Sequence, residues 1–212
     1  MKKFKQLAID ISILDDDLHA FEMLLNAESH LKERDQIIPF FKQRPHLCAA
    51  LGFLHGNIEL PNLWSNELHL FGDFVCDAAS GDSEANAFTL IEFEDAKEHS
   101  IFLKLADAKS MKHWSPRFEH GFSQIADWAW RLSTEGGGSS AFRRIFGDND
   151  PVIHFVLIVG RDADLTDDDK ARLRWRANNV SFGQYRMSCF TFDAVLGSLR
   201  RRLSLARQAN TL

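Results

Sequence analysis

Two acidic residues stand out because their spacing in a strand could hold a cation. Glu92 and Glu94 belong to the apolar segment Phe88-Thr89-Leu90-Ile91-Glu92-Phe93-Glu94, which is typical of a β-strand. Successive side chains of a strand point to opposite faces, so both carboxylates leave the same face about 7 Å apart. Two carboxylates among apolar neighbours are costly unless a cation or water offsets their charge. The alternative is that both glutamates cover a solvated face of an edge strand.

A third carboxylate, Asp73, begins the preceding predicted strand. The polar segment 80–86 is suited to a hairpin loop between the two strands. If Ala79 and Ala87 flank this loop, the numbers of facing residues sum to about 165 to 167, and Asp73 lies opposite residues 92–94. An odd sum places Asp73 on the face of both glutamates and an even sum on the other face. Three convergent carboxylates would form the hard oxygen site that Mg²⁺ or Mn²⁺ prefers, and such an ion can activate water against a phosphodiester.

The other candidates for chemistry are cationic. Arg172 and Arg176 lie one helical turn apart and could hold phosphates, with Arg161 at a nearby strand end. Three aspartates at 167–169 begin the same predicted helix, so a solvated ion-pair face is the favoured alternative for these arginines. His120 could contact nucleic acid, although such a histidine more often bonds to nearby backbone. The histidine and cysteine spacings do not predict a structural zinc site.

A mixed α/β fold must position these residues. Ser115 and Pro116 predict the start of a long helix, and Gly136 follows its predicted end. The expected elements in chain order are helices at 14–29, 31–42 and from residue 45, strands at 67–71, 73–78 and 88–94, a helix at 116–135, a strand at 152–159, a helix at 167–177, a strand at 186–190 and a C-terminal helix. We therefore predict a helical N-terminal segment, 1–60, and a main domain, 61–212, with helices on both faces of one sheet.

Composition and charge limit the class of protein. The chain has 212 residues, of which 45% are hydrophobic and 26% charged, and this composition excludes bulk disorder. The net charge of −5 argues against a general nucleic-acid coat protein. Residues 1–106 carry 9 Lys and Arg against 18 Asp and Glu, whereas residues 107–212 carry 16 against 12, which leaves room for a local phosphate-binding face. Without a long apolar run, a phosphate-binding glycine loop or paired cysteines, we predict a cytoplasmic protein with no membrane contact and no organic cofactor.

Five segments carry a resemblance to a known family through their order along the chain. They are Phe71-Gly72-Asp73-Phe74, then Leu90-Ile91-Glu92-Phe93-Glu94, then Trp114-Ser115-Pro116-Arg117-Phe118-Glu119-His120-Gly121-Phe122-Ser123-Gln124 leading to Trp128, then Leu157-Ile158-Val159-Gly160-Arg161, and finally Thr191-Phe192-Asp193. The set resembles the PD-(D/E)XK nuclease superfamily and, over residues 35–202, the Shedu family of bacterial antiphage nucleases. The resemblance implies a restriction-endonuclease-like mixed sheet flanked by helices, with residues 61–212 as the nuclease-like domain.

The resemblance also implies a role for each matched residue. Asp73 and Glu92 would be catalytic metal ligands for Mg²⁺ or Mn²⁺, and Glu94 is the candidate for a further catalytic ligand. Gln124 would be a catalytic residue that orients a water or contacts a phosphate. The implied partner is DNA, and a homo-oligomer is the assembly to test. The residues expected to contact nucleic acid are Arg117, His120, Arg161, Arg172 and Arg176.

Glu94 departs from the family pattern, which expects Lys at this position. A glutamate cannot supply the positive charge with which that Lys would orient water and stabilise negative charge. Some restriction endonucleases of the superfamily use Glu-x-Glu with the second Glu as a ligand or base, and here Lys97 or Lys112 could supply the charge.

From the resemblance as a whole we predict an antiphage defence nuclease that hydrolyses DNA phosphodiester bonds with a metal ion. The alternative is a catalytically inactive module that binds nucleic acid or protein partners.

Overall fold

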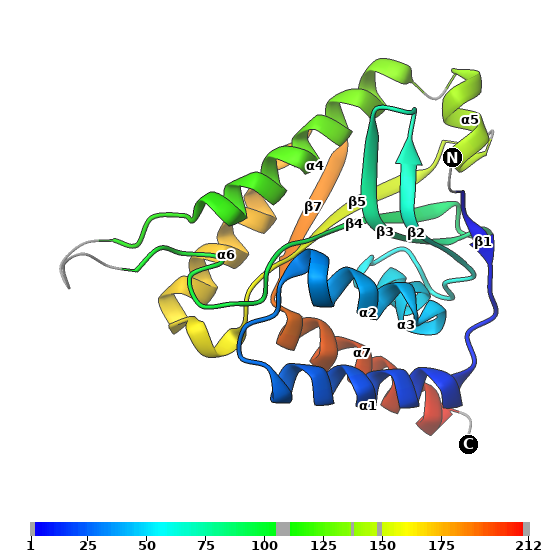
Figure 1. Cartoon of the computed structure of the whole chain (residues 1–212). Helices are drawn as coiled ribbons and strands as arrows, with labels where there is room; N and C mark the ends of the chain where they lie inside the picture. The colour runs from blue at the N-terminus through cyan, green and yellow to red at the C-terminus, as the bar shows by residue number, and fades with distance from the viewer. Residues whose placement is uncertain (1–2, 105–110, 137, 148–149, 210–212) are drawn as a thin grey trace.

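The computed structural model describes residues 3–104, 111–136, 138–147 and 150–209. At its centre is a seven-stranded sheet with the strand order β1-β2-β3-β4-β5-β7-β6 (Figure 1). The strands are β1 (Lys5–Gln6), β2 (Leu63–Leu70), β3 (Phe74–Asp82), β4 (Ala87–Phe93), β5 (Val152–Ile158), β6 (Ser181–Phe182) and β7 (Tyr185–Phe190). Strands β1 to β4 pair antiparallel, β4, β5 and β7 are parallel, and β6 pairs antiparallel with β7. The predicted α/β class with one mixed sheet is confirmed.

Helices cover both faces of this sheet. They are α1 (Ile11–Ala27), the π-helix η1 (Glu33–Ile37), α2 (Ile38–Lys42), α3 (Pro45–Ala50), the 3₁₀ turn η2 (Leu51–Leu54), α4 (Pro116–Glu135), α5 (Ser140–Phe146), the 3₁₀ turn η3 (Asp162–Asp164), α6 (Asp167–Asn179) and α7 (Phe192–Ala209). Helices α1, α2, α3 and α7 share one buried cluster with Phe93, and α4, α5 and α6 share the other with Phe155. Residues from before and after the expected division at residue 60 pack together in the cluster that contains Phe93. None of the helices in the described ranges combines the length and the apolar character that a membrane span requires.

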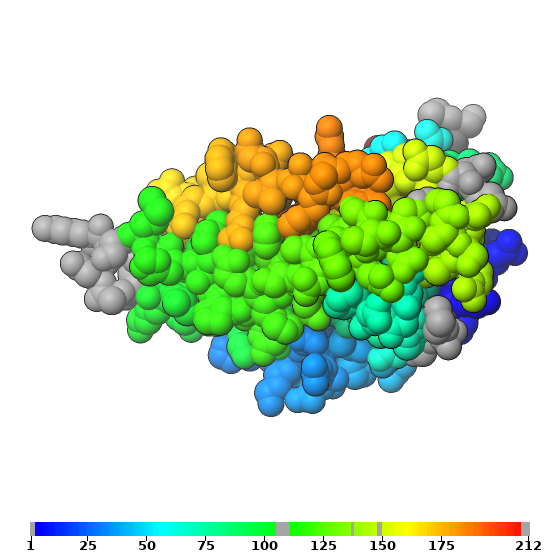
Figure 2. All heavy atoms as spheres, turned by 90° about the horizontal axis from the view of Figure 1, so that it is seen from above, coloured from blue at the N-terminus to red at the C-terminus, as the bar shows by residue number. Residues whose placement is uncertain are grey.

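Local sequence sets the ends of α4, the helix that contributes most of the site. The Ser115 hydroxyl accepts the Phe118 N–H at 3.0 Å, and Pro116 is the first helical residue. Gly136 follows the last turn with φ +65°, a conformation that glycine adopts without steric cost. The predicted helix boundaries are therefore confirmed. Seen from above, α4 crosses the surface between the orange α6 and β7 on one side and the β2–β3 hairpin with the blue N-terminal segment on the other (Figure 2).

The turn between β3 and β4 is shorter than the sequence suggested. Strand β3 continues to Asp82, which faces Ala87 across the hairpin, so residues 83–86 alone form the turn. The Asp82 carboxylate accepts the backbone N–H groups of Glu84 at 3.0 Å and Ala85 at 3.1 Å. Aspartate commonly stabilises a turn in this way. The strand therefore ends four residues beyond Ala78, the end that was expected.

This turn changes the register of the carboxylates. Ala78 faces Ile91, so the next position along β3, Asp77, lies across from Glu92. The expectation that Asp73 faces residues 92–94 is wrong, because β3 extends further toward the turn than predicted. Asp73 lies in the turn that precedes β3.

Candidate active site

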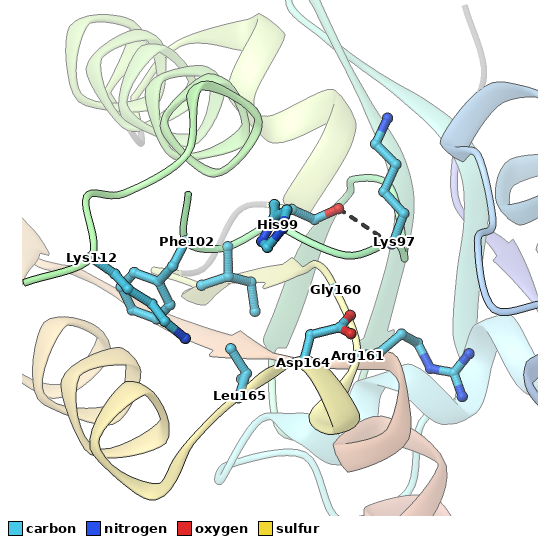
Figure 3. A pocket seen from close by; sticks show the side chains of 10 residues that line it. Lys97, His99, Phe102, Lys112, Gly160, Arg161, Asp164 and Leu165 are labelled. Carbon is cyan, nitrogen blue, oxygen red and sulfur yellow. Dashed lines mark hydrogen bonds between the residues drawn. The ribbon is translucent and has the colours of Figure 1, made fainter. Parts of the chain in front are cut away.

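Two pockets lie near the strand ends, and the first is too small for a substrate. It encloses about 10 Å³, room for about one water. Lys97 and Lys112 line it from either side (Figure 3). Lys97 pairs with Asp95 at 2.6 Å and Lys112 with Asp169 at 2.5 Å. Lys97 and Lys112, which were expected to supply positive charge beside the glutamates, are therefore paired with Asp95 and Asp169 instead.

The second pocket is an open cavity of about 420 Å³ between the N-terminal segment, strands β2 to β4 and α4. Four carboxylates line it, and we call it the acidic cavity: Glu33 from η1, Glu67 from β2, Asp77 from β3 and Glu92 from β4. Its remaining polar lining includes Gln124. Carboxylates this close repel each other when they are ionised, so a metal ion or another cation would be stabilised in this cavity.

Asp77 is the site residue that the sequence reasoning missed. Its Oδ2 accepts the backbone N–H of Phe93 at 2.9 Å, so the carboxylate is tied to β4 directly between the two glutamates. Burial raises the pKa of Asp77 to about 7; the Phe93 N–H opposes this rise, and the charges of Glu33 and Glu94 add to it. Asp82 is the residue in the sequence that could have indicated this, because aspartate is typical of a turn. A turn that begins directly after Asp82 places Asp77 opposite Glu92.

Glu92 has one oxygen that is satisfied and one that is not. The side chain is only 4% exposed, and Gln124 Nε2 on α4 donates a hydrogen bond to its Oε1. Its Oε2 is buried and has no hydrogen-bond partner. Burial raises the pKa of Glu92 well above its usual range, and the charges of Asp77 and Glu94 add to the rise. A buried oxygen without a partner is costly, and a bound cation or water there would remove the cost.

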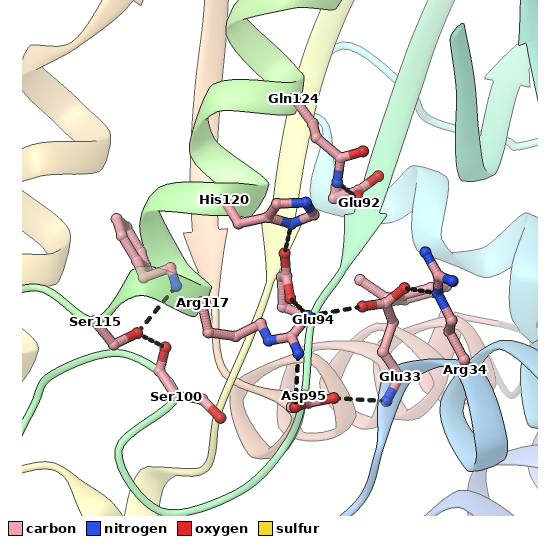
Figure 4. A network of polar contacts seen from close by, with 12 residues as sticks. Glu33, Arg34, Glu92, Glu94, Asp95, Ser100, Ser115, Arg117, His120 and Gln124 are labelled. Carbon is pink, nitrogen blue, oxygen red and sulfur yellow. Dashed lines mark hydrogen bonds and ion pairs between the residues drawn. The ribbon is translucent and has the colours of Figure 1, made fainter.

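Glu94 is fully buried and contacts the beginning of α4. Its Oε1 lies 2.7 Å from His120 Nδ1, and its Oε2 accepts from Arg117 Nη1 at 3.1 Å. Burial raises the pKa of Glu94, whereas the hydrogen bond from His120 and the charge of Arg117 lower it. Arg117 also lies 3.5 Å from both Glu33 and Asp95 (Figure 4). Glu94 therefore belongs to an ion-pair network that joins β4, α4 and η1.

Asp73, predicted as a metal ligand, lies outside the acidic cavity. Its side chain is 56% exposed, and its carboxylate pairs with Arg131 Nε at 2.8 Å. Arg131 follows Gln124 by about two turns of α4, which corresponds to roughly 10 Å along the helix axis. The placement of Asp73 beside Glu92 is therefore corrected, and Asp77 occupies that position.

Three arginines expected to contact nucleic acid are bound within the protein. Arg161 forms two bonds to Asp193, at 2.9 and 3.0 Å. Arg176 forms two bonds to Glu119, at 2.7 and 2.9 Å. Arg172 donates to a backbone carbonyl at 2.9 Å. Arg176 thus pairs with α4 and Arg172 with backbone, and neither contact is to the aspartates 167–169 that the ion-pair alternative named. Arg117 and His120, the other two residues of the expected set, lie in the network around Glu94.

The carboxylates of the acidic cavity are chemically suited to a hard cation, although their positions do not form a complete coordination shell. Within the described ranges, no three or more His, Cys, Asp and Glu side chains are placed to hold a metal ion together. Asp77 and Glu92 nevertheless share the acidic cavity, and one buried oxygen of Glu92 lacks a partner. Carboxylate oxygens are the ligands that Mg²⁺ and Mn²⁺ prefer. Asp77 and Glu92 are thus the residues that could hold such an ion.

Comparison with known proteins gives one family. No curated protein matches the chain. A family model described as Shedu protein SduA, C-terminal, matches residues 30–196, from just before η1 into α7. This range contains every residue of the acidic cavity and of the network around Glu94. Because the match spans more than half of the chain, the protein belongs to the Shedu SduA C-terminal family, a family of antiphage defence proteins.

Proposed function

We propose that this Shedu-family protein hydrolyses DNA phosphodiester bonds with a divalent metal ion, Mg²⁺ or Mn²⁺, held by Asp77 and Glu92. The observation that carries the proposal is the pairing of these two carboxylates. They lie across β3 and β4 from each other in one open cavity, and Glu92 Oε2 is buried without a partner. Family membership supports the setting, antiphage defence, in which DNA is a fitting substrate.

Each residue of the cavity would contribute a definite function. A bound Mg²⁺ or Mn²⁺ would polarise a phosphoryl oxygen and lower the pKa of a bound water. Asp77 and Glu92 would hold the ion through their carboxylate oxygens. Gln124 orients Glu92 by donating to Oε1, which leaves Oε2 for a ligand. Glu94 would join the site only by exchanging its contacts with His120 and Arg117.

A cleavage assay tests the proposal. Purified protein is incubated with plasmid and linear DNA in Mg²⁺, Mn²⁺ or EDTA, and we expect cleavage with either ion but not with EDTA. Asp77→Asn and Glu92→Gln should each lower the rate by about 100-fold or more, because losing a hydrogen-bond partner of a metal ligand already costs about 10- to 100-fold and these variants alter the ligands themselves. Asp73→Asn is the matched control and should retain activity. Absence of cleavage with both ions, or full activity of both cavity variants, would contradict the proposal.

A catalytically inactive module that binds nucleic acid or protein partners is the second candidate. The observation that favours it is the engagement of Glu94 by His120 and Arg117, which leaves fewer ligands facing the cavity. Titration calorimetry separates the two candidates. Heat of Mg²⁺ or Mn²⁺ binding that disappears in Glu92→Gln supports the nuclease, whereas DNA binding without any metal binding selects the inactive module.

A further inference from the structure

We infer that Lys42 is the phosphate-binding cation of the acidic cavity and that Glu67 is the residue that positions it, an inference that rests on the proposed function. Lys42 is the last residue of α2 and lines the same cavity as Asp77 and Glu92. Its Nζ lies 2.6 Å from Glu67 Oε1. The N-terminal segment thereby brings a positive charge to carboxylates that belong to the sheet.

The backbone that carries Lys42 is packed directly on the strand of the two glutamates. The ring of Phe41 stacks on the ring of Phe93, with centroids 4.6 Å apart and planes inclined by 25°. Both rings are almost completely buried. Phe93 is the residue between Glu92 and Glu94, so this stack fixes the end of α2 relative to the motif. Lys42 therefore reaches the cavity from a rigid position and not from a loose loop.

Glu67 has an unusual backbone at the point where it meets Lys42. Its φ is +53°, a left-handed conformation that costs free energy for a residue other than glycine. Asn66 pairs with Ala78, and pairing resumes two residues later along β2, so the ladder is interrupted where Glu67 lies across from Asp77. Strained positions of this kind concentrate at functional sites. The interruption places the Glu67–Lys42 ion pair beside Asp77 and at the cavity.

Electrostatics requires a cation where a phosphate enters. An incoming phosphate meets the carboxylates of Glu33, Glu67, Asp77 and Glu92, and their repulsion opposes its binding. A metal ion offsets part of this charge, and the ammonium of Lys42 offsets more. An ammonium carries three N–H donors, so the bond to Glu67 leaves donors for a non-bridging phosphate oxygen. A positive charge at that oxygen also stabilises the charge that develops during phosphoryl transfer.

The other cations near the cavity are placed differently. Arg117 is shared among Glu94, Glu33 and Asp95. The side chain of Arg34 is 89% exposed and lies at the rim. Lys42 lines the cavity with its ammonium bound to Glu67, and its side chain, 36% exposed, stays accessible to a ligand.

Binding and cleavage assays together test the inference. The affinity for a short fluorescent DNA duplex is measured by anisotropy in EDTA and in Ca²⁺ over a range of salt concentrations. Lys42→Met should weaken binding roughly 5- to 10-fold and lower the salt slope by about 1, as expected for one lost phosphate contact. Lys42→Arg, which keeps the charge, should restore most of the affinity. Lys32→Met, at an exposed lysine of the same segment, is the control and should change neither quantity.

Glu67 is tested through its dependence on Lys42. Glu67→Gln should weaken binding less than Lys42→Met does. The double variant should be no weaker than Lys42→Met alone, because Glu67 acts by holding Lys42. Additive losses in the double variant would show an independent structural role for Glu67 and overturn its assignment.

The outcomes separate this inference from the proposed function. If Lys42→Met binds and cleaves like the wild type while Glu92→Gln is inactive, the nuclease proposal stands and the inference is overturned. If the wild type does not cleave DNA, the nuclease proposal fails, and the anisotropy titration still shows whether Lys42 binds phosphate. In that case an unchanged affinity and salt slope for Lys42→Met, or an equal loss for Lys32→Met, overturns the inference, and a selective loss supports it.

Discussion

Three carboxylates within a short stretch of sheet have three different environments. Asp77 accepts a backbone N–H, Glu92 accepts from Gln124 through one oxygen, and Glu94 is paired with Arg117. Burial favours the protonated form of each of them. At Glu94 the protein supplies its own positive charge, whereas Asp77 and Glu92 face an open cavity where an external cation can enter.

The environment of Asp77 predicts a pH-dependent stability. Its pKa of about 7 is raised from the ordinary 3.8, so the folded state holds this proton more tightly than the unfolded state. The stability that results is fully present below about pH 4 and is lost as the pH rises through about 7. In EDTA, Asp77→Asn should therefore raise the Tm by several degrees near pH 8 and by little near pH 4.5. Thermal unfolding at both pH values checks this, and an equal shift at both would contradict it.

The buried Glu94 predicts the effect of removing its cation. Arg117→Met should lower the free energy of unfolding by about 1–3 kcal/mol, because it leaves a buried carboxylate without its charged partner. The exposure of the Arg117 side chain, 40%, keeps the loss below that of a fully buried pair. Adding Glu94→Gln removes the second charge and should restore part of the stability. Urea unfolding measures both, and a double variant less stable than Arg117→Met would refute the explanation.

At the scale of elements, α4 is the part that sets the geometry of the site. It contributes Gln124, which contacts Glu92 of β4, and Arg117 and His120, which contact Glu94 directly after β4. Its close approach depends on Gly121, which faces the sheet without a side chain. A Cβ at this position would lie 2.7 Å from Leu157 Cδ1 and 2.9 Å from the Glu94 side chain. The distance between α4 and the sheet is thus limited by one glycine.

Gly121→Ala tests this dependence. Overpacking should destabilise the protein by about 1–3 kcal/mol, more than the gain of up to about 1 kcal/mol that alanine gives in a helix. If Asp77 and Glu92 hold a metal ion as proposed, the variant should also bind it more weakly, because moving α4 displaces Gln124 from Glu92. Gly138→Ala is the control, since a Cβ there meets nothing within 4 Å. Unfolding in urea and metal titration measure the two effects, and equal stability of the two variants would exclude close packing as the cause.

At the scale of the whole molecule, Arg161 joins segments that are far apart in sequence. It binds Asp193 at the start of α7 and donates to the carbonyl of Leu25 at 2.9 Å, in the last turns of α1. Helices α1 and α7 lie side by side beneath the sheet in Figure 1. One guanidinium therefore connects the end of β5 to both helices. The N-terminal segment that carries Lys42 follows directly after this anchor.

Arg161→Met should loosen the N-terminal helix. We expect a loss of about 2–4 kcal/mol in the free energy of unfolding, because two charge-assisted bonds and their partners are left unsatisfied. Hydrogen exchange in the last turns of α1 should rise more than exchange in β4, whose backbone hydrogen bonds run to β3 and β5. Mass spectrometry of exchanged peptides checks the pattern. If exchange in α1 is as slow in the variant as in the wild type, the contacts of Arg161 do not stabilise this helix.

The sequence by itself determined most of the larger elements, although not α5, β1 or β6, because caps and periodicity depend on neighbouring residues. The order of its motifs along the chain carried the family resemblance. Ser115, Pro116 and Gly136 mark α4, and alternation along one strand places Glu92 and Glu94 on one face. Their roles as metal ligands stay predictions. Residue patterns of this kind are local, so they can be recognised without knowledge of the fold.

Only the tertiary structure decided which residues meet. The hairpin register depends on where one turn closes, and a shift of a few residues exchanged Asp73 for Asp77 opposite Glu92. The partners of Arg161, and of Lys42 in the acidic cavity, lie on distant segments. Ion pairs and hydrogen bonds act over a few ångströms of space, whatever the separation along the chain. For this reason the composition of the site follows from packing, which the sequence pattern alone does not specify.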